Sequence, residues 1–232
     1  GRATFYEADL SPGNCSFGTP DWPFTVALPT WAYDGGRPCG AFVELSSVGA
    51  TGVSSPGTCT DNTTVIAMVT DQCPEASNPQ WCGPSQNGVM HFDLSDNTFD
   101  ELFVPACGAV QGFGWRWVER PDNSTISIAS SSGSNPYWFS FTVRAHRYAL
   151  VAAEVRDASP NAMWLSLPRA SWNEWIAQNN SGWVAPLSIR LTDVHGQQVT
   201  LTDVVTSVAP STVFTSTVQF PAGRGGGNPL SP

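Results

Sequence analysis

Short runs of β-branched and aromatic residues recur along the chain, and Gly, Pro, Asn and Asp separate them. Such runs are typical of β-strands, and the separating residues are typical of turns. In the first half, the pattern predicts short buried strands at residues 3–6, 40–45, 64–69 and 110–118. The longest predicted helix covers only residues 95–102. The pattern therefore predicts a mainly β fold.

The second half alternates more strongly between apolar and polar positions. At residues 138–144, three apolar side chains share one face, and the opposite face carries Trp138, Ser140, Thr142 and Arg144. This pattern predicts a half-buried strand, and an exposed Trp on its polar face suggests a binding role. The later runs have the spacing of a two-sheet sandwich and lie at residues 148–156, 163–167, 187–192, 198–204 and 213–220.

Two details of the second half follow from local pattern. In the run 163–167, alternation predicts that Met163, Leu165 and Leu167 face inward, which turns Trp164 the other way. A Trp beside a sheet edge more often packs than binds, so we expect Trp164 to pack. Residues 193–196, Asp-Val-His-Gly, predict a hairpin turn.

A break in the pattern divides the chain. Residues 120–124, Arg-Pro-Asp-Asn-Ser, include residues that terminate strands, and every cysteine lies before them. We predict a first domain at residues 1–121, a short linker at 122–123 and a second domain at 124–221. The tail, residues 222–232, is rich in Gly and Pro and is predicted to be disordered.

Composition narrows the fold class and the partners. The chain has 232 residues with 19 Pro and 21 Gly, which argues against a helical protein. Its formal net charge is −9, and every cation is Arg. Phosphate binding needs a concentrated basic patch, so we expect no nucleic-acid partner, and the same reasoning disfavours acidic polysaccharides. No window is apolar enough to span a membrane, so no membrane partner is expected. The lack of Lys is typical of a high-GC bacterial gene.

Six cysteines, all before Val110, indicate an oxidising compartment and therefore a secreted, extracellular protein. Zinc binding is the rival interpretation. No C-x-x-C motif is present, and the histidines, His91, His146 and His195, lie far apart in the sequence. We therefore favour disulfides and predict no metal and no cofactor.

The densest cluster of chemically capable residues lies at 69–95 and contains Asp71 and Asp93. Asp71 follows the buried strand predicted at 64–69, and strand ends commonly carry functional sites. Asp93 has apolar neighbours, which raise the pKa of a carboxyl group by desolvation and can keep it protonated as a proton donor. Alternatively, Asp93 caps the helix predicted at 95–102, although Ser95 is the better cap candidate. The pattern alone leaves both interpretations open.

Several short motifs occur in a fixed order along the first domain. They are Ala-Thr-Phe-Tyr at residues 3–6, Gly-Ala-Phe after Cys39, VTDQCP at 69–74, Trp81-Cys82 and HFDLS at 91–95. Together they resemble the core signature of the expansin family, and the resemblance continues almost to the C-terminus. Two positions vary within the family: Phe42 stands where a second Cys often occurs, and Cys73 follows the plant-type version.

The resemblance implies a six-stranded double-psi β-barrel followed by an immunoglobulin-like β-sandwich. In expansins, one Thr and two Asp form the polar floor of a shallow polysaccharide groove, and these residues match Thr4, Asp71 and Asp93. Loosening is expected to depend on Asp93. Thr4 and Tyr6 share one strand face, and Tyr6 and Trp81 are candidates for the groove walls.

The expansin sandwich is a cellulose-binding module that uses a flat row of three aromatic side chains. Tyr137, Trp138 and Trp172 match this platform, while Trp175 and Trp183 are predicted to be core residues. Alternation supports an outward Trp138 but turns Tyr137 inward, unless the strand begins after the preceding Pro.

Our hypothesis for the disulfides is Cys15 with Cys39, Cys59 with Cys107 and Cys73 with Cys82. It is one of fifteen pairings that six cysteines allow.

The resemblance implies a secreted, monomeric, non-hydrolytic protein that binds cellulose and related β-glucans and loosens plant cell walls. The alternative is an inverting endo-β-1,4-glucanase of the related family-45 type, in which Asp93 matches the general acid. The position matching the base is Ala8, with Glu7 and Asp9 on either side. A lytic transglycosylase, which needs one acidic residue, is a third and weaker possibility.

Overall fold

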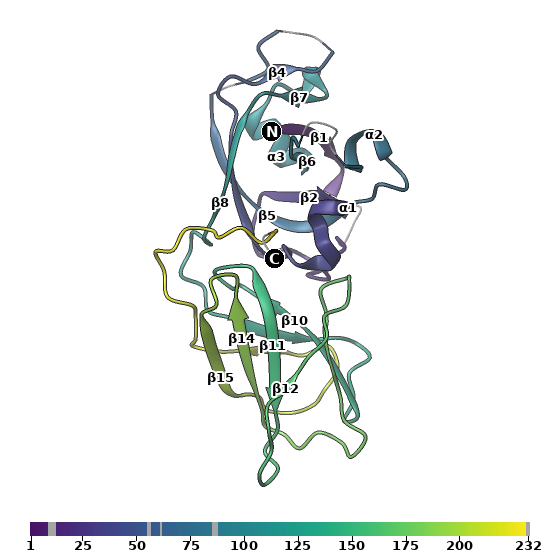
Figure 1. Cartoon of the computed structure of the whole chain (residues 1–232), viewed down its shortest axis with the longest axis vertical. Coiled ribbons are helices and arrows are strands. Elements are labelled where there is room, and N and C mark those ends of the chain that lie inside the picture. Colours follow the sequence, from purple (N-terminus) through teal and green to yellow (C-terminus); the bar gives the residue numbers. More distant parts are fainter. Residues whose placement is uncertain (9–12, 55–56, 61, 85–87, 231–232) are drawn as a thin grey trace.

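The computed structural model describes residues 1–8, 13–54, 57–60, 62–84 and 88–230. An eight-stranded sheet, built from residues up to Val118, forms one body, and two four-stranded sheets from Ser127 onward form the other. The two bodies lie one above the other along the long axis of the molecule (Figure 1). This arrangement confirms the predicted mainly β fold. In the ranges described, no helix is long and apolar enough to traverse a bilayer.

The first body is built from eight strands in the described part of the chain. They are β1 (Arg2–Tyr6), β2 (Thr25–Pro29), β3 (Phe42–Ser46), β4 (Thr51–Gly52), β5 (Thr64–Cys73), β6 (His91–Ser95), β7 (Val110–Gln111) and β8 (Gly114–Val118). Hydrogen bonds arrange them in the order β4-β7-β1-β6-β2-β5-β3-β8. Because β4 and β7 have only two residues each, six longer strands carry the sheet. At its centre, β1 pairs with β6 and β2 pairs with β5, both in parallel.

Short helices connect the strands: α1 (Thr30–Tyr33), η2 (Asp34–Gly36), α2 (Pro79–Cys82), α3 (Asp96–Leu102) and η3 (Pro105–Cys107). α3 confirms the predicted helix. Ser95 occupies the position before its first turn, and its hydroxyl group lies 2.6 Å from that of Thr98. Asp93 lies inside β6, so the interpretation that it caps the helix is wrong.

Two predicted strands of the first body have different limits. β5 continues to Cys73, because β2 supplies hydrogen-bonding partners as far as that residue. Asp71 therefore lies within the strand and not beyond its end. The strand predicted at 110–118 is divided into β7 and β8, and Gly112 between them has a φ of 83°, a left-handed conformation that suits glycine and interrupts a strand.

The three disulfides predicted above are confirmed. Their Cα–Cα distances are 5.6 Å for Cys15–Cys39, 6.1 Å for Cys59–Cys107 and 5.4 Å for Cys73–Cys82. The second spans 48 residues and therefore restricts the unfolded chain most. All three lie in the first body, where they supplement a core rich in phenylalanine.

The second body is a sandwich of two antiparallel sheets. Its strands are β9 (Ser127–Ser130), β10 (Trp138–Arg144), β11 (Leu150–Arg156), β12 (Leu165–Ser166), β13 (Trp175–Gln178), β14 (Leu187–Asp193), β15 (Gln198–Val205) and β16 (Val213–Thr215). The sheet orders are β13-β10-β9-β16 and β12-β11-β14-β15. The predicted strand at 138–144 is confirmed, as is the turn at 193–196, where the Gly196 N–H donates to the Asp193 carbonyl oxygen.

Two predictions for the second body are wrong. Met163 and Leu165 are 85% and 47% exposed, and only Leu167, at 8%, is buried. β12 has just two residues, so alternation does not extend across the predicted run. Ser140 was predicted to face solvent but is buried, because the segment 131–134 covers it and contributes hydrogen bonds to it. Thr142 is buried as well.

Buried polar contacts join the two bodies. His146 is 2% exposed and packs against Gly40, where a Cβ atom would lie 2.5 Å from the imidazole Nε2. Gly40 also has a φ of 75°, a left-handed conformation that favours glycine. The close contact with His146 and the backbone conformation therefore both require glycine at this position. Arg120, also 2% exposed on its side chain, pairs with Asp122 at 2.6 Å and with Asp21 of the first body at 3.2 Å.

Stability is expected to decrease at acidic pH because of His146. Burial lowers the pKa of this ring to about 3, whereas the unfolded chain binds a proton near the ordinary value of 6.5. The contribution is therefore fully present above about pH 6.5 and is lost as pH falls toward 3, by up to about 1.4 kcal/mol per pH unit. Urea denaturation at a series of pH values measures this slope. His146→Gln retains a donor for the Tyr148 carbonyl oxygen and should reduce the slope; an unchanged slope would assign it to other groups.

Residues 222–230 of the C-terminal segment contact the first body, and the disorder predicted for residues 222–232 stays a prediction. The Gly223 N–H donates to Glu119 at 2.9 Å, and Gly226 packs on the backbone of Val118 so closely that a Cβ atom would overlap it. Leu230 then contacts the core of the first body. The segment therefore returns from the sandwich to the barrel, as Figure 1 shows in yellow. Residues 231–232 lie outside the described residues.

Candidate functional site

Thr4, Asp93 and Asp71 lie in one row across the centre of the barrel sheet. Thr4 of β1 is opposite Asp93 of β6. Asp93 is in turn opposite Ala27 of β2, and Ala27 is opposite Asp71 of β5. Residues in register on adjacent strands point to the same face of a sheet. At a strand spacing of about 4.8 Å, the backbones of the two aspartates are about 10 Å apart, with only the small Ala27 between them.

A hollow of about 540 Å³ opens over this row. Its lining comes from five segments and consists of Tyr6, Gly13, Asn14, Ala27, Asp71, Gln72, Cys73, Pro74 and Asp93. A second hollow, of about 600 Å³, shares Gln72 and Pro74 with the first and extends to Thr30 and Pro79. We call the two together the groove. The structure thus brings Tyr6, Asp71 and Asp93 together, as the sequence predicted.

Thr4 is hydrogen-bonded to Asp93, which lines the groove. The Thr4 hydroxyl donates a hydrogen bond of 2.6 Å to Asp93 Oδ1. Burial raises the pKa of Asp93, this hydrogen bond opposes the shift, and the charge of Asp71 adds to it. The raised pKa that the apolar neighbours of Asp93 predict is therefore confirmed in direction.

Backbone amides hold the second carboxylate. Asp71 Oδ1 accepts hydrogen bonds from the Asn14 N–H at 2.6 Å and from the Gln72 N–H at 2.8 Å. The Asn14 side chain also donates to Gln72 Oε1 at 3.3 Å. The loop that contains Asn14 therefore determines how Asp71 faces the groove.

Trp81 packs beside the groove and not over its floor. Its ring centroid is 5.7 Å from that of His91, and the Arg2 guanidinium lies 4.7 Å from the ring. Among the described residues, those lining either hollow do not include Trp81. Its role as a groove wall stays a prediction.

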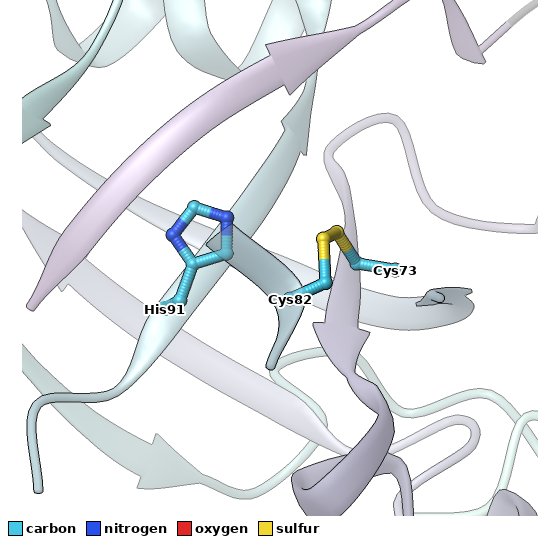
Figure 2. Close-up of side chains that lie close together, drawn as sticks. All are labelled: Cys73, Cys82 and His91. Carbon is cyan, nitrogen blue, oxygen red and sulfur yellow. A yellow bond between two sulfur atoms is a disulfide. The ribbon is translucent and has the colours of Figure 1, made fainter. Parts of the chain in front are cut away.

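The Cys73–Cys82 disulfide lies beside His91, at the edge of the groove (Figure 2). One ring nitrogen of His91 and the two sulfur atoms lie within 4.8 Å of one another. The sulfur atoms are bonded to each other, so neither is a thiolate that could bind a metal ion.

The aromatic residues of the second body fall into two groups. Tyr137 and Trp172 are 62% and 47% exposed, and Trp138 is half-buried. Tyr137 faces solvent because β10 begins after it, at Trp138, so strand alternation does not apply to it. Trp175 is 3% exposed and Trp183 packs against the core, which confirms both core predictions. We call Tyr137, Trp138 and Trp172 the platform.

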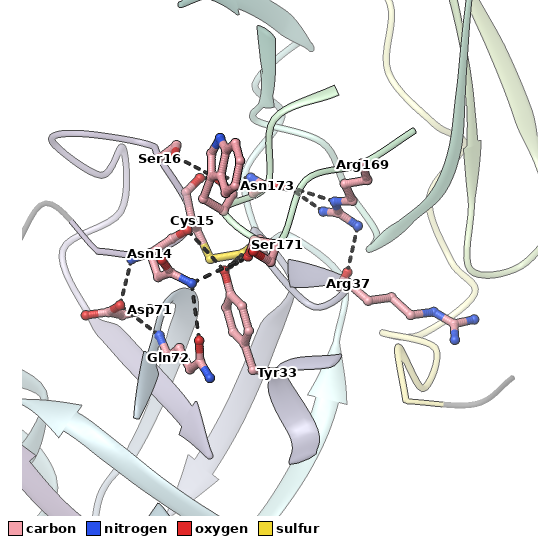
Figure 3. Close-up of a disulfide and its surroundings, with 12 residues drawn as sticks. Asn14, Cys15, Ser16, Tyr33, Arg37, Asp71, Gln72, Arg169, Ser171 and Asn173 are labelled. Atoms are coloured by element: carbon pink, nitrogen blue, oxygen red, sulfur yellow. Dashed lines mark hydrogen bonds between the residues drawn. A yellow bond between two sulfur atoms is a disulfide. The ribbon is translucent and has the colours of Figure 1, made fainter. Parts of the chain in front are cut away.

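The loop that carries Trp172 is fastened to the barrel next to the groove (Figure 3). Ser16 Oγ donates to the Trp172 carbonyl oxygen at 2.7 Å, and Asn173 Nδ2 donates to the Cys15 carbonyl oxygen at 2.9 Å. The Tyr33 hydroxyl lies 2.9 Å from the Ser171 carbonyl oxygen. We call residues 14–16 together with 171–173 the bridge. Because Asn14 also holds Asp71, the bridge joins the groove to the platform.

Sequence reasoning missed the bridge. Asn14, Ser16, Ser171 and Asn173 are ordinary loop residues, and their contacts between the two bodies span 138 to 158 positions of the sequence. No local pattern identifies such contacts. The Cys15 and Cys39 pairing, which anchors the barrel side, was the one available indication.

The residues proposed as a catalytic base are not gathered at the groove floor. Glu7 is exposed, and Ala8 lines a different hollow, of about 290 Å³, beside Trp22 and Asn97. Asp9 lies outside the described residues.

The comparisons with known proteins decide the family. Residues 2–119, half of the chain, match the family described as EXPB1-like domain 1. The chain belongs to the expansin family. Expansin-like protein 1 of Dictyostelium discoideum is 28% identical over 240 residues, which cover 100% of this chain and 75% of that protein. Endoglucanase-5 of Hypocrea jecorina is 29% identical over 130 residues, 49% of this chain and 52% of that enzyme.

Solved expansin structures from Clavibacter michiganensis match both bodies of this expansin. One of them is a mutant Clavibacter michiganensis expansin in complex with cellohexaose, with a TM-score of 0.72 and 25% identity, covering 96% of this chain and 98% of that one. The match confirms the implied order of double-psi β-barrel and immunoglobulin-like sandwich. The endoglucanase likeness, by contrast, covers only about half of this expansin.

Proposed function

We propose that this expansin is a secreted, monomeric protein that binds cellulose and related β-glucans and loosens plant cell walls without hydrolysing them. The observation that carries the proposal is the continuity from the row of Thr4, Asp93 and Asp71, across the bridge, to the exposed platform residue Trp172. A polymer chain, and not a small substrate, matches such an extended surface. The Clavibacter expansin that matches both bodies was crystallised with cellohexaose, a linear glucan.

The chemistry of the surface suits a neutral polysaccharide. Exposed aromatic rings bind the apolar faces of sugar rings, while carboxylates accept hydrogen bonds from hydroxyl groups. With a net charge of −9, the protein would repel acidic polymers. We assign the platform to binding and the groove to the disruption of contacts between neighbouring glucan chains.

Hydrolysis is the second candidate, and the raised pKa of Asp93 and the likeness to Endoglucanase-5 favour it. An inverting hydrolase also needs a carboxylate base at roughly 6.5–9.5 Å from the acid. The aligned position is Ala8, and Glu7 beside it is exposed. This arrangement supports the non-hydrolytic proposal.

Reducing-end release from a soluble β-1,4-glucan tests the choice. We expect no release over a long incubation from the native protein or from Asp93→Asn. Release that disappears in Asp93→Asn would make this protein an endoglucanase and would assign the base to Glu7 or Asp9.

A further inference from the structure

A chain of two hydrogen bonds leads from the groove to a buried ring behind it. Thr4 Oγ1 lies 2.6 Å from Asp93 Oδ1 and 3.2 Å from His91 Nε2. Asp93 reaches the groove, whereas His91 is 1% exposed. The other nitrogen of the ring, Nδ1, is buried and has no hydrogen-bond partner among the described residues. The chain therefore begins at the groove and ends at His91.

Because Thr4 has a single hydroxyl proton, the two hydrogen bonds allow two arrangements of their protons. When Asp93 is ionised, Thr4 must donate its proton to the carboxylate. His91 then donates to Thr4 through Nε2–H, and its Nδ1 is unprotonated. When Asp93 is protonated on Oδ1, it donates to Thr4, Thr4 donates to a bare Nε2, and His91 carries its proton on Nδ1. In both arrangements every donor between Asp93 and Nε2 has an acceptor.

We propose that His91 is a positioning residue for Asp93, and that its tautomer changes when Asp93 gains or loses a proton. The change takes up one proton overall. The new proton resides on Nδ1, the former Nε2 proton resides on Thr4, and the former hydroxyl proton resides on Asp93. Among Asp93, Thr4 and His91, only Asp93 changes its charge.

The surroundings of His91 favour a change of tautomer over a change of charge. Burial, with the nearby positive charge of Arg2, lowers the pKa of His91 to about 3. Two further neighbours of the ring, Trp81 and the Cys73–Cys82 disulfide, are uncharged. The ring thus stays neutral while it exchanges one N–H for the other.

The groups that face Asp93 also affect the protonation of its carboxyl group. The negative charge of Asp71 and burial both favour the protonated carboxyl, and the Thr4 hydrogen bond favours the ionised form. Tyr6, on the strand that carries Thr4, stays neutral because burial and both aspartates raise the pKa of its hydroxyl group. Of these ionisable groups, Asp93 is the one that the Thr4 hydrogen bonds connect to His91.

The consequence of this tautomer change for glucan binding rests on the proposed function. A proton that the chain holds on Oδ1 points to Thr4, so Oδ2 remains an acceptor for a glucan hydroxyl group in either protonation state. His91 would thereby keep Asp93 a binding group and prevent it from donating its proton to a glycosidic oxygen.

NMR of the imidazole nitrogens and of the Asp93 carboxyl carbon, recorded across a pH series on the full chain without glucan, tests the inference. We expect His91 to change from the Nε2–H to the Nδ1–H tautomer with the same midpoint as the Asp93 carboxyl. One tautomer throughout the titration of Asp93, or formation of the imidazolium at that midpoint, would overturn the proposal. The measurement needs no wall-loosening activity, so its outcome is independent of the proposed function.

Two variants at one position provide the matched control. Thr4→Ser retains the hydroxyl group and should retain the shared midpoint. Thr4→Val has nearly the same shape without the hydroxyl, so the His91 tautomer should no longer follow Asp93. A tautomer change that persists in Thr4→Val would show that the two residues are coupled by another route, against the proposal.

Discussion

Replacing Asp93 with Asn is expected to reduce strongly the extension rate of plant cell-wall strips under constant load. Asn has the shape of Asp but is neutral, and a hydrogen bond to a charged acceptor contributes about 1.5–3 kcal/mol, against about 0.5–1.5 kcal/mol for a neutral pair. The midpoints of these ranges differ by about 1.3 kcal/mol, so we expect the extension rate to fall about tenfold. Retention on crystalline cellulose should not change, because the platform lies in the other body.

Asp100→Asn is a suitable control for this experiment. Asp100 is an exposed carboxylate on α3, and the same change of charge there should leave extension unaffected. Loss of cellulose retention in Asp93→Asn would contradict the assignment of binding to the platform. Extension at the native rate would remove Asp93 from the mechanism.

Removing the two exposed platform rings together should largely eliminate retention on crystalline cellulose. Stacking on an aromatic ring contributes about 1–3 kcal/mol in single-stranded nucleic acids, and we use the same scale for sugar rings. Tyr137→Ala with Trp172→Ala should then weaken binding at least about 30-fold, measured as a binding isotherm on cellulose. Because both rings are largely exposed, the fold should tolerate their removal.

Met163→Ala is the matched control for the platform. Met163 is the most exposed of the large apolar side chains described, at 85%, and it precedes β12 in the sheet opposite to the one that contains β10. Its removal should leave the isotherm unchanged. Native binding by the double variant would show that the platform is assigned to the wrong residues.

Alternation predicted the apolar face of a sandwich strand well where the strand is long. β10 matches the predicted range, and its apolar face is buried. The prediction failed for Met163 and Leu165, because a strand of two residues does not impose alternation on its flanks. It failed for Ser140, because residues 131–134, which precede the strand in the sequence, fold back over its polar face.

The candidate site was predictable to the extent that it lies in short motifs. Thr4, Asp71 and Asp93 belong to three such motifs, and the strand register aligns them in one row. The link from Asp93 through Thr4 to His91 was not predictable, because it depends on side-chain distances across two strands. The bridge was not predictable either, because it joins loops that are far apart in the sequence.

The bridge also determines which partner changes shape during binding. Hydrogen bonds to the backbone carbonyl groups of Cys15, Ser171 and Trp172 connect the groove to the platform. A glucan that occupies both surfaces at once must adopt the path that the protein presents. Under the proposed function, the polysaccharide and not the protein would then change shape on binding.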